Sequence, residues 1–389
     1  MAAALSPAQA LGQSLRRELT HLRGNRWDRN FIVLVPLLCL LVLGWLFSAG
    51  VMRQIPIALV DEDHSAQSRT LARMLDASPG LAIASQPVDM AAAQSQLRAL
   101  EVFAIVRIPE GLAREGLRGQ GAAVHAFYNA TYLATGQSAA REIGDVVTAF
   151  NADLLRGQTA ALAGPANVRV APVAVQARLL FNPSRNFALF LFPMTAAATL
   201  SLCMALATVA AFGRELRAPA LWPGPYPWAA ALGKLLPYLA VFAVQLALAL
   251  AYSAWCLGDG LAGSAVLLGI GIVLFLLASA GMGLLLLGLT RDMGVSLSLT
   301  GMVMGTALAF SGATFPVIDG PAFTRFWNHL LPLTPWLELQ NQLLLVGSPS
   351  ADVLRTMAGL LPFVLLCGPL GLARLFATLR TRAQQEAQA

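Results

Sequence analysis

The sequence predicts a polytopic α-helical membrane protein with six transmembrane helices and an α/β domain inserted after the first of them. Of the 389 residues, 57% are hydrophobic and only 12% are charged, whereas soluble domains are about one-quarter charged. Six apolar runs are long enough to cross a bilayer, for which about 20 residues suffice. Residues 51–185 differ from the rest, because polar and apolar stretches alternate there with turn signals, as in a soluble domain.

An amphipathic helix is expected at residues 5–24, within a cytoplasmic segment that spans residues 1–30. Ser6 can cap this helix, and Pro7 suits its first position. Four leucines recur on one face at helical spacing: Leu11, Leu15, Leu19 and Leu22. Such a helix can lie in the membrane surface with its apolar side down. The alternative is an ordinary helix that packs on a partner.

The six spans are expected at residues 31–50, 187–212, 234–257, 262–289, 294–313 and 353–375. The last five form a transmembrane domain over 186–376. Five arginines closely precede the first span, so the positive-inside rule places the N-terminus in the cytoplasm. An even number of spans returns the tail, 377–389, to the same side. The loop that carries Arg214 and Arg217 is expected there too, which agrees with the charge rule.

Residues 51–185 predict an α/β domain of ordinary size. Strands are expected at 55–61, 81–85, 102–108 and 122–128, helices at 64–77, 90–100, 110–118 and 131–163, and an extended segment at 168–180. The longest helix repeats apolar residues every seven positions from Leu133 to Ala161, which suits packing on the sheet or on another helix. Because a single span precedes it, this domain is expected outside the cytoplasmic membrane. Long translocated domains escape the charge rule.

Several kinds of chemistry are not supported by the residues. No expected span carries a charged side chain or His near its middle, which argues against ion-coupled secondary transport. No P-loop stretch is present, so ATP and Mg²⁺ would be bound by a partner chain. The run Asp61–Ser65 could suggest a metal site, but a strand end leading into a helix cap explains it. We therefore predict no catalytic, cofactor or metal residue, and the net charge of +6 indicates topology rather than nucleic-acid binding.

Two further features allow a structural and a functional interpretation. Gly301 and Gly305 are four residues apart in an apolar run, a spacing that permits close helix packing but also occurs by chance. Arg214-Glu215 is either a solvated loop or a docking site for a partner, since charged pairs can orient an interface.

The segment before the last span carries the clearest resemblance to a known family. Ser311-Gly312, then Phe315-Pro316, then Leu-Pro-Leu-Thr-Pro at 331–335 resemble the C-terminal signature of ABC-2-type transporter permeases. In that family such a turn precedes an extracytoplasmic re-entrant element. The resemblance implies an outer gate formed by Phe310, Ser311, Gly312, Phe315 and Pro316.

Other segments extend this resemblance over nearly the full chain. Arg17-Glu18-Leu19 resembles the family's elbow helix, and residues 213–215 and 233–237 resemble the two ends of its coupling segment. Residues 218–223 depart from the Gly-Thr-x-Glu-Gln-Leu-like stretch of the family. Residues 57–69, 182–183 and 186–187 resemble the subgroup with a large extracytoplasmic insert. The resemblance implies that coupling to the ATPase uses Arg17, Glu18, Arg214, Glu215 and Arg217.

The function implied by the resemblance is that of the permease subunit of an ATP-driven exporter. It would move a hydrophobic or amphipathic, drug-like or lipid-like substrate out across the inner membrane of a bacterium. Its expected partners are an ATP-binding subunit, a second permease chain and, in some systems, a periplasmic adaptor. The alternative is a membrane scaffold or receptor whose external domain binds a partner, and an ATP-binding subunit encoded nearby would favour export. An intramembrane enzyme would need polar catalytic residues at membrane depth, which the spans lack.

Overall fold

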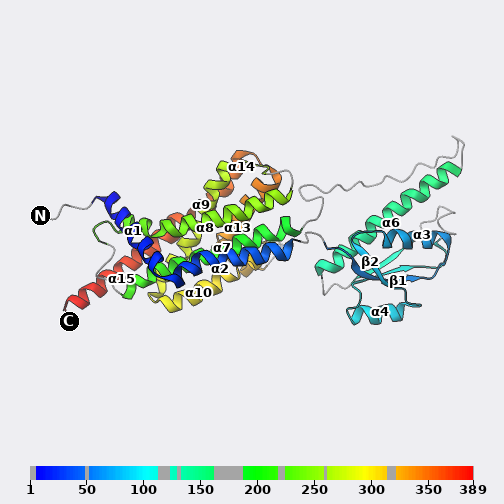
Figure 1. The fold of residues 1–389 in the computed structure, drawn as a ribbon, viewed down its shortest axis with the longest axis horizontal. Coiled ribbons are helices and arrows are strands. Elements are labelled where there is room, and N and C mark those ends of the chain that lie inside the picture. The colour runs from blue at the N-terminus through cyan, green and yellow to red at the C-terminus, as the bar shows by residue number, and fades with distance from the viewer. Residues whose placement is uncertain are drawn as a thin grey trace. The chain divides into compact units, whose positions relative to one another are not determined.

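The computed structural model describes residues 6–48, 52–112, 123–128, 133–161, 187–217, 224–257, 261–312 and 321–388. The chain divides into a membrane unit, Met1–Gly50 with Leu179–Ala389, and a second unit, Val51–Arg178 (Figure 1).

The membrane unit begins with α1 (Pro7–Gly24), which starts where the sequence predicts. The Ser6 hydroxyl accepts a hydrogen bond from the Gln9 amide, and the Gln9 side chain accepts one from Ser6 in return. This reciprocal cap satisfies two amides that the first helical turn leaves free. The predicted roles of Ser6 and Pro7 are therefore confirmed.

Six helices of the described chain are long and apolar enough to span a membrane, which confirms the expected number. They are built from α2 (Arg26–Phe47), α7 (Phe187–Gly213), α8 (Pro227–Leu257), α9 (Ala265–Thr290), α10 (Met293–Gly305) with α11 (Ala307–Phe310), and α14 (Ser350–Ala358) with α15 (Gly368–Gln388). Between α10 and α14 lie α12 (Ala322–Leu330), α13 (Leu333–Asn341) and the π-turn η4 (Gln342–Val346).

Two boundaries differ from the sequence prediction. The expected loop over 213–233 is shorter, because residues 214–217 form the 3₁₀ turn η2 and α8 already begins at Pro227. Proline is tolerated in the first turn of a helix, so Pro227 starts α8 rather than delaying it. The last span is interrupted by the π-turn η5 (Phe363–Cys367), and α15 continues as a helix through most of the expected tail.

The core of the membrane unit forms around α9, which packs against α7, α8, α10 and α15. Glycines allow the closest approaches: a Cβ on Gly283 would lie 2.7 Å from the Ala205 carbonyl oxygen, and one on Gly371 would lie 2.3 Å from the Leu284 backbone. No described atom lies within 4 Å of a Cβ placed on Gly301 or Gly305. Helix packing by those two glycines therefore stays a prediction.

The described residues of the second unit contain a four-stranded sheet in the order β2-β1-β3-β4. Its strands are β1 (Ile55–Asp61), β2 (Leu81–Ser85), β3 (Ala104–Ile108) and β4 (His125–Tyr128). β1 is parallel to β2 and β3, whereas β4 is antiparallel to β3. The expected extended segment 168–180 lies outside the described residues, as does most of the helical turn expected at 110–118.

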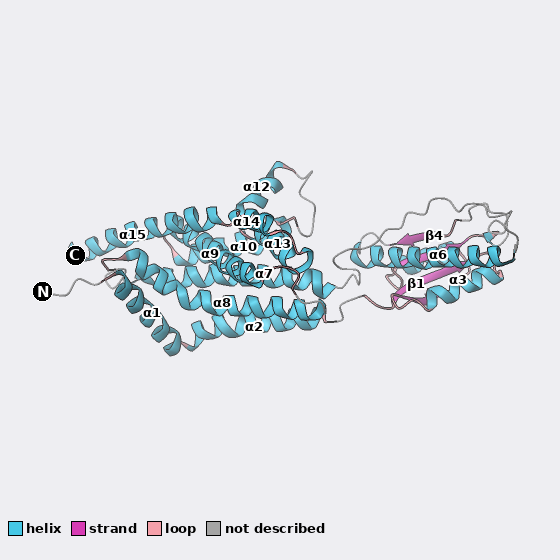
Figure 2. Ribbon diagram, turned by 90° about the horizontal axis from the view of Figure 1, so that it is seen from above, coloured by secondary structure: helices cyan, strands magenta, loops and turns pink. Residues whose placement is uncertain are grey.

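The strands of this sheet are the magenta arrows of Figure 2. Side chains along β1 alternate between the two faces of the sheet. Ile57 packs with α3 (Ala66–Asp76) and α6 (Leu133–Ala161) on one face. Ala58 packs with α4 (Met90–Arg98) on the other. The sheet is thereby covered by helices on both sides, as is usual for parallel strands.

The polar run Asp61–Ser65 adopts the cap geometry expected of it. Ser65 accepts from the amide of Ser68, and Asp61 accepts from two amides of the following turn. Within the described chain, no group of three His, Cys, Asp or Glu side chains could hold a metal ion. Hydrogen bonds from Arg107 lower the pKa of Glu62 at the adjacent strand end.

Candidate functional site

Four of the five residues predicted to couple the chain to an ATPase meet in one place. Arg17 and Glu18 come from α1, and Arg214 and Glu215 come from η2. They converge on the first turns of α8, next to the C-terminal end of α7 and the N-terminal end of α2. We call the connected side chains the elbow network: Arg17, Glu18, His21, Asp28, Arg214, Glu215, Lys234 and Tyr238.

Lys234, the only lysine of the chain, lies at the centre of the elbow network. Its side chain is 3% exposed, and its Nζ donates to Glu18 Oε2 at 2.8 Å and to Glu215 Oε1 at 2.5 Å. A buried ammonium is costly unless it is paired and hydrogen-bonded. Two carboxylates provide that pairing, Glu18 from α1 and Glu215 from η2. The Nζ of Lys234 therefore links α8 to both segments.

Glu18 is equally buried and accepts from three side chains. Besides Lys234, the Tyr238 hydroxyl donates to Glu18 Oε1 at 2.5 Å, and Arg214 donates to the same oxygen. Burial alone would raise the pKa of Glu18. The charge and hydrogen bond of Lys234, the hydrogen bond of Tyr238 and the charge of Arg214 outweigh it and lower the pKa below its ordinary value. Glu18 is therefore ionised at neutral pH.

The outer part of the network reaches the start of α2. Arg214 donates to Asp28 and lies 2.7 Å from His21 Nε2, which in turn lies 2.7 Å from Asp28 Oδ2. Arg17, whose side chain is 45% exposed, donates to Glu215 Oε2 at 3.2 Å. The ion pairs of the network join three carboxylates, those of Glu18, Asp28 and Glu215, to the side chains of Arg17, Arg214 and Lys234.

Two contacts with backbone carbonyl oxygens hold α1 against α8 near the elbow network. The Ser14 hydroxyl donates to the Ala230 carbonyl oxygen at 2.7 Å. A Cβ on Gly233 would lie 2.3 Å from the Leu11 carbonyl oxygen, so only glycine fits this approach. The two helices are thus in direct contact in the turn of α8 that precedes Lys234.

The face of α1 that packs is not the leucine stripe. Its buried residues are Ala10, Ser14 and Glu18, spaced four apart, whereas Leu19 is exposed. Leu11 and Leu15 are half-buried, and Leu22 packs in part against the core of the membrane unit. Placement of the leucine face in a membrane surface stays a prediction. Two small residues and one acidic residue at a spacing of four, Ala10, Ser14 and Glu18, were the sequence signal for the packed face. The more prominent leucine pattern pointed to a different face.

A further arginine ties the end of α15 to η2. Arg382 donates to the Leu216 carbonyl oxygen at 2.8 Å and approaches the Arg291 carbonyl oxygen at 3.4 Å. Arg217, the fifth residue assigned to coupling, is exposed and takes no part in the elbow network. The sequence placed Lys234 at one end of the segment that resembles the family's coupling segment but gave it no role of its own, and it assigned no role to Tyr238, Asp28 or Arg382. The position of a lone lysine at the start of a span was the available signal.

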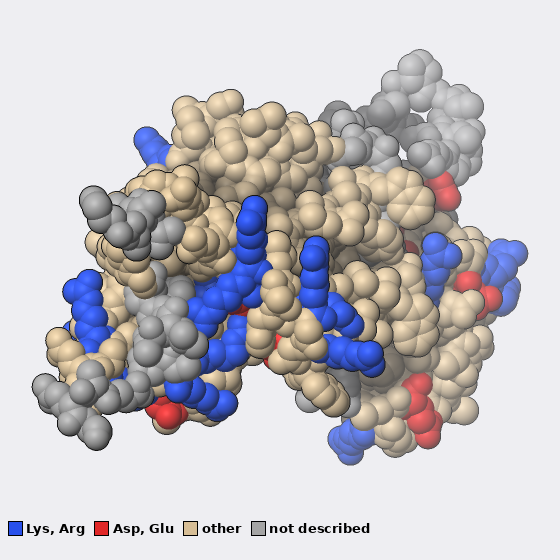
Figure 3. Space-filling view, turned by 60° about the vertical axis from the view of Figure 1, so that its left-hand side comes forward, with Lys and Arg blue, Asp and Glu red and all other residues tan. Residues whose placement is uncertain are grey.

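Basic side chains gather on this end of the membrane unit (Figure 3). Exposed arginines there come from α1, η2 and α15 and include Arg16, Arg23, Arg217 and Arg380. They give the exposed surface at this end of the membrane unit a positive charge.

The segment assigned to an outer gate is described only in part. Ser311 ends α11, its hydroxyl donating to the Leu308 carbonyl oxygen, and Gly312 turns the chain with a φ of +81°. From α12, Asn328 donates to the Phe310 carbonyl oxygen at 2.8 Å, and Trp327 meets the Phe310 ring edge-on. Phe315 and Pro316 lie outside the described residues, as do residues 218–223. The re-entrant element therefore stays a prediction.

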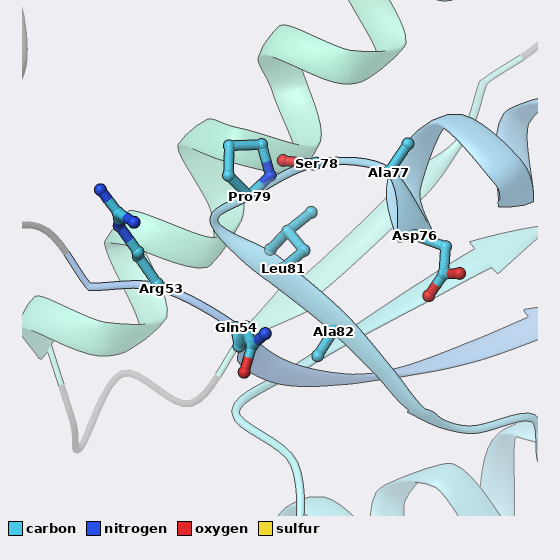
Figure 4. A pocket seen from close by; sticks show the side chains of 8 residues that line it. All are labelled: Arg53, Gln54, Asp76, Ala77, Ser78, Pro79, Leu81 and Ala82. Atoms are coloured by element: carbon cyan, nitrogen blue, oxygen red, sulfur yellow. The ribbon is translucent and has the colours of Figure 1, made fainter.

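The second unit has an open groove of about 600 Å³ beside the start of β1 and β2 (Figure 4). Its two charged residues, Arg53 and Asp76, lie on opposite sides and do not converge on a common point. The groove has no cluster of polar groups comparable with the elbow network.

A family model for ABC-2 family transporter proteins matches residues 26–373. The chain belongs to the ABC-2 transporter family. Searches with this sequence against curated proteins and against solved structures found no match. As an ABC-2 permease it is a multi-pass membrane component of an ABC transporter, a type of subunit that is generally non-catalytic and works with a separate ATP-binding partner.

Proposed function

We propose that this ABC-2 permease exports a hydrophobic or amphipathic, drug-like or lipid-like substrate across the inner membrane of a bacterium. Both termini would lie in the cytoplasm, and residues 51–185 would lie outside and guide substrate outward, in some systems to a periplasmic adaptor. A second permease chain would complete the translocation path. A partner subunit would bind and hydrolyse ATP with Mg²⁺.

The observation that carries this proposal is the elbow network. It joins α1, η2 and α8, the segments that the family resemblance assigns to coupling. Because Glu18 and Glu215 are buried and paired inside the chain, we assign them to transmission of motion between helices. Contact with the ATP-binding subunit falls to the exposed arginines, Arg217 among them.

Transmission through this network follows from the cost of breaking it. Pulling α1 away from α8 would leave Lys234 and Glu18 buried without their partner, a loss of about 3–5 kcal/mol for a buried pair. Movement of α1 and α8 as one body avoids that loss. A push on the elbow helix by the ATP-binding subunit would therefore reach the first turns of the third span.

At the other end, the turn at Gly312 and the aromatic contact between Phe310 and Trp327 support an outer gate in this segment. Phe315 and Pro316 would complete it. Opening would require the Phe310 ring to separate from α12.

The test is co-purification of the full chain with the ATP-binding subunit encoded nearby, together with its ATPase rate. Lys234→Met should leave the complex intact and lower the ATPase rate that depends on this chain at least tenfold. Arg217→Ala should weaken the complex itself, and Arg214→Ala/Glu215→Ala should impair coupling. Arg355→Ala, an exposed arginine on α14, is the matched control and should change neither quantity.

The outcomes separate the proposed function from its alternative. Failure to form a complex with any such subunit would refute export and favour a scaffold or receptor. If the complex forms and Lys234→Met leaves its ATPase rate unchanged, the protein would still be assigned as an exporter, but the elbow network would have no role in coupling.

A further inference from the structure

Three exposed arginines gather where α1 ends and α2 begins, at the corner between the two helices (Figure 2). Arg23 belongs to the last turn of α1, and Arg26 and Arg29 belong to the start of α2. Arg26 and Arg29 are three positions apart, a spacing that makes them neighbours on a helix surface. Arg29 Nη1 donates to the Arg23 carbonyl oxygen at 3.5 Å, so the Arg29 side chain reaches back to the end of α1. We call these three residues the arginine corner.

The positive charge of the arginine corner is not neutralised by the described part of the chain. Asp28 is the carboxylate of the first turn of α2, and its Oδ2 accepts from Arg214 in the elbow network. No ion pair among the described residues includes an arginine of the corner. Neighbouring charges of one sign repel each other, so an anion from outside the chain would be bound favourably here.

The exposed face of α2 shows at what depth in a bilayer the corner lies. Trp27 and Trp45 are each 79% exposed. Between them, exposed apolar side chains recur at a spacing of three or four: Phe31, Leu34, Leu38 and Leu41. The helix rises about 27 Å from one tryptophan to the other, close to the hydrocarbon thickness of about 30 Å.

Tryptophan prefers the two interfaces of a membrane, so Trp27 marks one of them. Arg26 precedes Trp27 directly, and Arg29 follows it within one turn. Long arginine side chains near the end of a span extend towards the headgroups. The guanidinium groups of the corner are therefore expected at the level of the lipid phosphates, whereas the ring of Phe31, one turn further along α2, faces hydrocarbon.

We propose that the arginine corner binds the phosphate of an anionic phospholipid, whose acyl chains lie along the exposed rings of Trp27 and Phe31. Guanidinium groups pair with phosphate oxygens through two parallel hydrogen bonds, and phosphate is the anion that a bilayer offers at this depth. A headgroup such as phosphatidylglycerol keeps its net negative charge, whereas the choline of phosphatidylcholine adds a cation that the arginines repel. The proposal does not rest on export, and Arg217 remains the candidate for contact with the ATP-binding subunit.

The test is thermal unfolding of the full chain in a neutral detergent, without a partner subunit, as phosphatidylglycerol or phosphatidylcholine is added. Each arginine near a membrane surface contributes about 1 kcal/mol of attraction to anionic lipid, or about fivefold in affinity. Phosphatidylglycerol should therefore stabilise the wild type at a lipid-to-detergent ratio about a hundredfold lower than phosphatidylcholine does. Arg23→Gln/Arg26→Gln/Arg29→Gln should reduce this preference to about fivefold or less.

A second triple variant, Arg23→Lys/Arg26→Lys/Arg29→Lys, keeps the three charges. It should retain most of the preference, because attraction to the headgroup depends mainly on charge. This variant separates loss of lipid binding from a defect in folding, since both triple variants replace the same three side chains.

The matched control, Arg98→Gln/Arg355→Gln/Arg380→Gln, removes the same total charge from exposed positions on three other helices. It should keep the preference of the wild type. Trp27→Ala should weaken the binding of both lipids by a similar factor, because its ring contacts the acyl chains that the two lipids share.

Glycerol 3-phosphate carries the phosphate without acyl chains and should not displace phosphatidylglycerol. Displacement would assign the corner to a soluble anion and overturn the proposal. Equal stabilisation of the wild type by the two lipids, or an equal loss of preference in the matched control, would also overturn it. If the glutamine variant kept the lipid preference but no longer bound the ATP-binding subunit, the corner would be a protein contact instead.

Discussion

Replacing Lys234 with methionine removes one charge from the centre of the elbow network and keeps the aliphatic stem. At an effective dielectric constant of about 20, a unit-charge contact at 2.8 Å is worth about 6 kcal/mol. Desolvation of the ammonium offsets several kcal/mol of this. Glu18 would keep Arg214 and Tyr238, and Glu215 would keep Arg17. We therefore expect a loss near the lower end of the range for a broken buried pair, about 3 kcal/mol in the free energy of unfolding.

The assay is equilibrium unfolding of the purified chain in mixed micelles with increasing SDS. Arg16→Met removes an exposed arginine from the same region and should change stability by about 0.5 kcal/mol or less. The double variant Glu18→Gln/Lys234→Met removes a carboxylate with its partner. It should cost about 1–3 kcal/mol less than the two single changes together. A Lys234→Met variant within 1 kcal/mol of the wild type, or strictly additive costs, would refute the reasoning.

Three further predictions follow from the same unit. Gly233→Ala should cost about 1–3 kcal/mol of unfolding free energy, because its Cβ would overlap the Leu11 carbonyl oxygen; Gly12→Ala, which meets nothing within 4 Å, should be neutral or stabilising in the same assay. Because folding lowers the pKa of Glu18 from 4.5, the stability that its carboxylate provides is complete above the ordinary carboxyl pKa and is lost as pH falls through the lowered value. The free energy of unfolding should therefore depend less on pH below about 4.5 in Glu18→Gln than in the wild type. The same pH dependence in both proteins would contradict a role of Glu18. Gly301→Leu should leave the stability of the single chain unchanged but reduce cross-linking between two permease chains, and undiminished cross-linking would exclude this face from the interface.

Local signals in the sequence were sufficient for most individual elements. Ser6 and Pro7 specify the start of α1 through hydrogen bonds and backbone geometry within one turn. The alternation over Ile55–Asp61 and the apolar runs of the spans likewise depend on neighbours close in the chain. The family signature also lies within short segments, and the match over residues 26–373 confirms the family.

Interruptions inside helices were not predictable in this way. The π-turn at Phe363–Cys367 lies in a continuous apolar run, and periodicity shows only that the run is buried. The early start of α8 at Pro227 was hidden by neighbouring prolines that suggested a loop. Tertiary packing decides such cases, because propensity is a weak guide to where a helix begins.

By itself the sequence determined the family and the number of apolar helices. It also identified four charged residues as candidates for coupling: Arg17, Glu18, Arg214 and Glu215. Only the tertiary structure decided that these charges meet around Lys234, with Glu18 and Glu215 buried. The physical reason is that the energy of a buried charge depends on partners from distant parts of the chain. Glu18 and Lys234 are 216 positions apart, and only the packing of α1 on α8 brings their atoms within 3 Å.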